Sequence, residues 1–69
     1  MPTTLEELEE EKYFVSRGMA EFGGSFIAAL GQTLAHADPS NTKKIKVTWP
    51  VEWEEYREKG KKSHVEDQI

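Results

Sequence analysis

The chain has 69 residues, no cysteine and a formal net charge of −4 at neutral pH. A chain of this length forms at most one domain, and the lack of cysteine excludes disulfides and thiolate metal sites as stabilisers. The acidic balance argues against a general nucleic-acid binder, because contacts to phosphate need a positive face. Self-association is the remaining way to reinforce so small a core, so we expect a homo-oligomer.

The residue pattern also argues against metal sites and membrane spans. His36 and His64 lie far apart in the chain, so we expect no metal site and no cofactor. The longest apolar stretch, residues 26–30, is too short to cross a bilayer. Residues 1–15 have neither the basic start nor the apolar core of a signal peptide. We therefore expect a cytoplasmic protein without membrane attachment.

The first predicted element is a helix that begins near Thr4. Thr4 and Glu7 have the spacing of a capping box, and acidic residues in the first turn complement the positive end of the helix dipole. Leu5 and Leu8 supply a thin apolar side. We expect this weakly hydrophobic helix to dock on a larger body.

The pattern leaves open whether residues 4–37 form one helix or two. Apolar positions spaced by three and four residues continue past Gly18, as in one long heptad-patterned helix. Gly18, Gly23 and Gly24 interrupt that run, and each glycine inside a helix costs about 1 kcal/mol relative to alanine. We prefer a break at Gly23-Gly24, with a new helix beginning at Ser25.

Residues 25–37 carry the clearest helical signal in the chain. Their apolar side chains recur at helical spacing and predict one buried face. These are Phe26, Ile27, Leu30 and Leu34. A second face carries only small residues, namely Gly24, Ala28, Gly31 and Ala35. Small residues let another helix approach closely, either within the chain or across a symmetric dimer contact.

Asp38-Pro39 marks the next boundary, with Asp38 as helix cap and Pro39 at the first helical position. Residues 44–49 then alternate polar and apolar side chains and are rich in β-branched residues, which is a strand pattern. Nothing else in the sequence looks like a strand to pair with them, and a lone strand leaves its backbone groups unsatisfied. We therefore predict a helix over residues 39–48, with an intermolecular strand pairing as the alternative.

Trp49-Pro50 ends that helix, since the residue before proline is pushed out of helical geometry. The last predicted helix is short and begins at Pro50. Its aromatic face is made by Trp49, Trp53 and Tyr56. Gly60 is a suitable stop.

These elements together predict an all-α fold, a small bundle of three to four short helices completed by oligomerisation. We place a single helical domain over residues 1–60 and a disordered polar tail over residues 61–69. Aromatic side chains dominate small cores, so we expect Phe22 and Phe26 to join the aromatic face of the last helix in the core.

Three runs of sequence form one recognisable pattern. They are Gly23-Gly24-Ser25-Phe26-Ile27-x-x-Leu30, His36-Ala37-Asp38-Pro39-x-Asn41 and Trp49-Pro50-x-x-Trp53-x-x-Tyr56. This pattern resembles short, uncharacterised helical proteins encoded by bacteriophages and prophages. Such proteins usually carry helix-compatible residues before the Trp-Pro step, where this chain has Val47-Thr48. The resemblance implies a phage or prophage origin and a bacterial host cell, and it marks helix boundaries and core positions, not catalytic residues.

We expect no catalytic constellation. Ser25 and His36 on one helix are separated by about 16 Å of helical rise, so they cannot form a dyad within one chain. So small a core also leaves little room for a dry substrate pocket. The chain is therefore expected to bind and not to catalyse.

Gly23-Gly24-Ser25, directly before a helix, is the most suggestive ligand-binding feature. Glycines let the backbone approach a ligand, and the free N–H groups at a helix start suit phosphate or carboxylate. The same three residues are also the ordinary pattern of a turn with a serine cap. Basic residues that could complete an anion site, or that could simply form a solvated face, are Arg17, Lys43, Lys44 and Lys46.

The alternative to a role in the core is that one or two of the tryptophans anchor a protein partner or stack on a base. The candidate partner-binding residues are Trp49, Trp53, Tyr56 and His36. The preferred functional hypothesis is an accessory protein that binds a host protein stoichiometrically and so inhibits a host process such as anti-phage defence. The alternatives are an oligomeric sponge for a small anionic nucleotide signal and a structural or virion-associated subunit.

Overall fold

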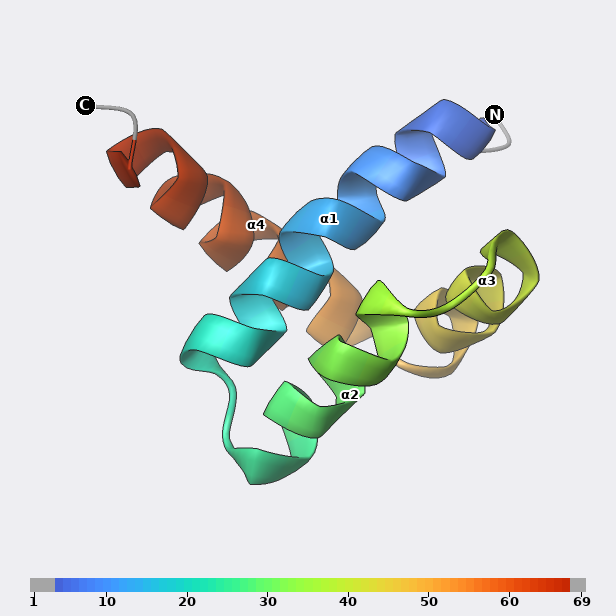
Figure 1. Ribbon diagram of the computed structural model, residues 1–69, viewed down its shortest axis with the longest axis horizontal. Coiled ribbons are helices and arrows are strands. Elements are labelled where there is room, and N and C mark those ends of the chain that lie inside the picture. Colours follow the sequence, from blue (N-terminus) through green and yellow to red (C-terminus); the bar gives the residue numbers. More distant parts are fainter. Residues whose placement is uncertain (1–3, 68–69) are drawn as a thin grey trace.

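The computed structural model describes residues 4–67, which form four α-helices and the short turns between them. The helices are α1 (Leu5–Phe22), α2 (Ser25–Ala35), α3 (Pro39–Thr48) and α4 (Pro50–Asp67). Figure 1 shows α1 running through the middle of the molecule, with α4 crossing it on one side and α2 folding back beneath its C-terminal half. The α3 helix lies beside α2. The predicted all-α fold is therefore confirmed.

The N-terminal helix begins and ends where the local chemistry favours it. The Thr4 hydroxyl accepts a hydrogen bond from the Glu7 N–H at 3.1 Å, as the capping pattern predicts. The helix ends at Phe22, and both Gly23 and Gly24 have extended backbone conformations. The preferred break is confirmed and the single long helix is wrong, because two consecutive glycines favour a turn over continued helix.

α1 and α4 cross in direct backbone contact at two glycines. A Cβ atom at Gly18 would overlap the carbonyl oxygen of Tyr56, and one at Gly60 would overlap the carbonyl oxygen of Phe14. Both glycines are buried. Gly60 therefore serves a close helix crossing, and the prediction that it ends the helix is wrong.

The same crossing explains the length of α4. Its last two turns continue past Gly60 along α1, where buried Ser63 donates a hydrogen bond to the Glu21 carboxylate at 2.8 Å. Residues 61–67, predicted as part of a disordered tail, are helical. Residues 68–69 of that tail lie outside the described residues.

α3 is a helix, as preferred over the strand. The Asp38 carboxylate accepts the Asn41 N–H at 2.8 Å, and Pro39 occupies the first turn. Buried Thr42 adds a hydroxyl hydrogen bond to the Asp38 carbonyl at 2.8 Å. The Asp38 cap and the proline in the first turn favour the helix over the β-branched alternation, and residues 4–67 contain no strand.

The core is formed mainly by α1, α2 and α4. It contains Leu8, Val15, Met19, Leu30, Leu34, Trp53 and Tyr56. Phe26 is 63% exposed and Phe22 is about half exposed, so the expectation that these rings fill the core is wrong. Leu30 and Leu34 are buried, whereas Phe26, one turn earlier in the first turn of α2, stays mostly exposed and contacts Trp49.

Candidate functional site

The outer side of α2 differs from the rest of the molecular surface. Residues 23–37 contain no Asp, Glu, Lys or Arg, although 32% of the chain is charged. The helix nevertheless has a large exposed side. We call this side the α2 face; it consists of Ser25, Phe26, Ala29, Gln32, Thr33 and His36. Depletion of charge around an exposed aromatic ring is the composition of a protein-binding surface.

The α2 face is positioned by the core beneath it. Ile27, Leu30 and Leu34 point toward α1 and fix the rotation of α2 about its axis. Gly31 also lies against α1, where an added Cβ would come within 2.7 Å of the Met19 Cβ. The face is therefore held on a helix whose opposite side is closely packed.

A groove continues the α2 face toward α3. It has a volume of about 420 Å³ and is lined by Thr33, His36, Ala37, Asn41, Lys44 and Ile45. α2 and α3 run in opposite directions, so the end of α3 returns to the start of α2. There Phe26 meets Trp49 edge to face, with ring centroids 6.3 Å apart. The groove itself lies between residues 33–37 and the facing side of α3.

The turn at residues 36–38, beside the groove, is tied to α1. The Lys12 ammonium donates a hydrogen bond to the Ala37 carbonyl at 2.6 Å. The Asp38 cap holds the first turn of α3 in the same place. These bonds fix the spacing of α2 and α3 at this end, so the groove is preformed.

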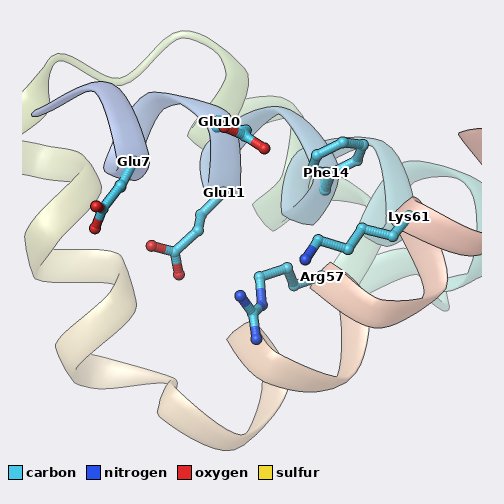
Figure 2. Close-up of a pocket in the computed structure, with 6 residues that line it drawn as sticks. All are labelled: Glu7, Glu10, Glu11, Phe14, Arg57 and Lys61. Atoms are coloured by element: carbon cyan, nitrogen blue, oxygen red, sulfur yellow. The ribbon is translucent and has the colours of Figure 1, made fainter. Parts of the chain in front are cut away.

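A second hollow lies between α1 and α4 and has a different character. Its volume is about 240 Å³, and its lining residues are Glu7, Glu10, Glu11, Phe14, Arg57 and Lys61. Figure 2 shows Arg57 and Lys61 reaching from α4 toward the carboxylates of α1. Charges of both signs meet here, whereas the α2 face has none.

Glu11 forms the centre of a polar network beside this hollow. Its carboxylate accepts hydrogen bonds from the Trp53 indole N–H at 3.1 Å and from the Lys46 ammonium at 3.2 Å. Burial raises the pKa of Glu11, but the two hydrogen bonds and the charges of Lys46 and Arg57 outweigh it, so the pKa lies below its ordinary value. Glu11 is thus an ionised carboxylate that joins α1, α3 and α4.

Arg57 is likewise engaged within the chain. Its guanidinium pairs with Glu54 at 2.7 Å and with Glu58 at 3.6 Å. Its Nε is buried and has no hydrogen-bond partner among the described residues. The hollow between α1 and α4 is therefore built largely from groups that stabilise the fold.

The predicted anion-binding residues are not gathered in one place. Gly24 and Ser25 are exposed at the start of α2, with half-buried Gly23 before them, whereas Lys44 adjoins Thr33 and His36, more than two helical turns away. Lys43 faces a different hollow beside Leu5 and Pro39. Lys46 is paired with Glu11. Arg17 donates a hydrogen bond to the Tyr13 hydroxyl at 3.0 Å on α1.

The predicted partner-binding residues and the predicted small-residue interface are also not gathered on one surface. Trp53 and Tyr56 are buried in the core and so offer no surface to a partner. Exposed His36 lines the groove, whereas half-buried Trp49 contacts Phe26 and is not part of the groove lining. The proposed small-residue stripe is not one free surface, because Gly31 is covered by α1. Gly24 and Ala35 are exposed, and Ala28 is half-buried.

Sequence reasoning missed several residues of the α2 face and its groove. These are Ala29, Gln32, Thr33, Asn41 and Ile45. The signal was present as the uninterrupted uncharged run over residues 23–37, which was read only for its helical period.

No protein-family model, curated protein or solved structure matches the chain. No helix within residues 4–67 is both long and apolar enough to span a bilayer.

Proposed function

We propose that this chain is a non-enzymatic accessory protein of phage type that binds a host protein stoichiometrically in the bacterial cytoplasm and so inhibits a host process. The α2 face is the surface assigned to that binding. The observation that carries the proposal is the 63% exposed Phe26 on a helix without a single charged residue. Isolated exposed apolar side chains are ordinary, but an uncharged exposed helix side beside a preformed groove is typical of protein interfaces.

Binding explains the arrangement better than catalysis does. Ser25 and His36 lie at opposite ends of α2, about 16 Å apart along the helix. Glu11, the carboxylate with a shifted pKa, is occupied by Trp53 and Lys46. The polar groups best held in place are thus used to join helices.

A sponge for an anionic nucleotide draws less support from a single chain. It requires the start of α2 and the α3 lysines to share a ligand, and within one chain they are more than two helical turns apart. That function would need a site formed between subunits. A structural or virion-associated role would use the same α2 face, with a virion protein as the partner.

The proposal is tested by placing a photo-crosslinking phenylalanine analogue at Phe26 and, separately, at Thr33, in cells of the bacterial host. We expect both positions to give an adduct with one host protein, with a mass that corresponds to one copy of each chain. Val65 on α4 is the control position, because it is similarly exposed at 58% but lies outside the α2 face. Adducts that contain only this chain are scored separately by mass. Equal labelling of all three positions, or no foreign adduct at any of them, would contradict the proposal.

A further inference from the structure

The exposed ring of Phe26 and the groove between α2 and α3 lie on the same side of the molecule. The ring is a projection, and the groove is a hollow that could receive it. Phe26 stands in the first turn of α2, and the groove begins at Thr33, about 10 Å further along the helix axis. The hollow of about 420 Å³ is large enough to receive a phenyl ring. Apart from Lys44 at its margin, its lining residues carry no Asp, Glu, Lys or Arg.

We infer that a second copy of this chain covers the α2 face, with the two α2 helices antiparallel about a two-fold axis near Ala29. In that arrangement the Phe26 ring of each copy enters the groove of the other copy. The two-fold symmetry therefore produces two identical ring–groove contacts. The small side chain of Ala29 at the centre lets the helices approach closely. The inference rests on the proposed role of the α2 face as a protein-binding surface and adds that a second copy occupies this face when no host protein is bound.

Charge favours this face for self-association. Two copies each carry a net charge of −4 and repel one another. Along the first half of α1, exposed Glu6, Glu7 and Glu10 form no ion pair among residues 4–67, so pairing two copies there would place like charges together. The α2 face brings no charged residue of its own to the contact. A second copy therefore meets less repulsion on the α2 face than along the acidic half of α1.

The size of the α2 face sets the expected affinity between the two copies. An 11-residue helix presents a strip only about 16 Å long, so the contact falls at the small end of specific interfaces. We expect a reversible dimer with a dissociation constant on the order of micromolar. A host protein that uses the same face would have to replace the second copy, which makes self-association a regulator of the proposed binding.

Sedimentation velocity over a wide concentration range tests the inference directly. The wild-type chain should pass from monomer to dimer as concentration rises. Ala29→Glu at the predicted axis and Phe26→Ala should each raise the dissociation constant at least tenfold. Val65→Glu adds the same charge as Ala29→Glu at an exposed site on α4 and should leave the dimer unchanged. Circular dichroism confirms that each variant remains helical.

The absence of cysteine allows a second test of the geometry. Ala29→Cys places one thiol near the predicted axis, and a short bismaleimide should link two copies efficiently. Val65→Cys should not be linked. A chain that stays monomeric at every concentration, or a dimer that survives both Ala29→Glu and Phe26→Ala, would overturn the inference.

The two proposals fail separately. A monomeric chain that still forms a foreign adduct from Phe26 keeps the proposed function and loses the dimer. A dimer that is weakened by Phe26→Ala but never forms a foreign adduct keeps the inference and loses the host target.

Discussion

At the α1–α4 crossing, two glycines bring the helix backbones into contact, and a carboxylate, an ammonium and an indole N–H are joined beside it. On the outer side of α2, nothing within residues 4–67 covers an exposed phenylalanine, and the helix has no charge. The residues at the crossing stabilise the fold, whereas the residues of the α2 face are exposed and can contact a second molecule. This difference predicts that substitutions at the crossing lower the stability, whereas substitutions on the α2 face alter association.

The largest effect is expected at the helix crossing. Gly60→Ala would force a methyl group against the Phe14 carbonyl, so α1 and α4 must separate. We expect a loss of about 3 kcal/mol in the free energy of unfolding, measured by urea denaturation. Gly24→Ala is the matched control, because an added Cβ there meets nothing within 4 Å, and it should change stability by less than about 0.5 kcal/mol. Equal losses of unfolding free energy for Gly60→Ala and Gly24→Ala would show that the helix crossing is no more sensitive to substitution than the start of α2.

The Glu11 network should give a smaller, pH-dependent effect. Glu11→Gln removes the charge that pairs with Lys46 and should cost about 1 to 2 kcal/mol at neutral pH. The pKa of Glu11 is lower in the folded than in the unfolded chain, so its contribution is present above the ordinary glutamate pKa of about 4.3 and is lost as pH falls through the folded value.

Urea denaturation as a function of pH checks the sign of this effect. The stabilities of the wild-type and Glu11→Gln proteins should converge at acidic pH. Glu10→Gln, at an exposed carboxylate of the same helix, should change stability by less than about 0.5 kcal/mol. A gap between wild type and Glu11→Gln that persists unchanged at acidic pH would show that the charge of Glu11 is not what stabilises the fold.

The N-terminal cap of α3 should contribute about as much to the free energy of unfolding as a typical helix cap does. Asp38→Ala removes the acceptor for the Asn41 N–H and should lower the stability by about 1 kcal/mol. Ser40→Ala, at an exposed position in the same turn, should cause no loss. Thermal melts followed by circular dichroism distinguish the two variants, and equal melting temperatures would mean that the cap does not fix the start of α3.

The smallest effect on folding is expected on the α2 face. Phe26→Ser should change the stability of the monomer by only about 0.5 kcal/mol, because the ring is 63% exposed and touches Trp49 only at its edge. The measurement is made at concentrations where the chain is monomeric. A loss as large as that of Gly60→Ala would place Phe26 in the core and remove the basis for a binding surface.

The sequence predicted the helix boundaries best where short-range bonds decide them. The Thr4 and Asp38 caps, the Gly23-Gly24 break and the Trp49-Pro50 step each act within a few residues, and each prediction is confirmed. Gly60 was misread because a glycine that ends a helix and a glycine that admits a neighbouring helix are identical in sequence. Only the position of Phe14 on α1 distinguishes the two cases.

The candidate surface was predicted only in part. Of the four predicted partner contacts, His36 lines the groove and Trp49 contacts Phe26, but Trp53 and Tyr56 are buried. Helical spacing does not distinguish an aromatic side chain in the core from one on the surface. Whether each ring is buried depends on which side of its helix faces α1. The lysines and the glycine–serine turn were grouped by charge complementarity alone, and the fold separates them.

Capping residues, prolines and paired glycines act locally, so the sequence is enough to predict that this protein is helical and where most of its helices begin and end. Tertiary structure alone decided which aromatic rings are core and which are surface, that α4 continues past Gly60, and that α2 carries an open uncharged side. Those outcomes depend on the rotation of each helix about its axis. That rotation is set by close packing between residues far apart in the chain, and helical spacing alone does not encode it.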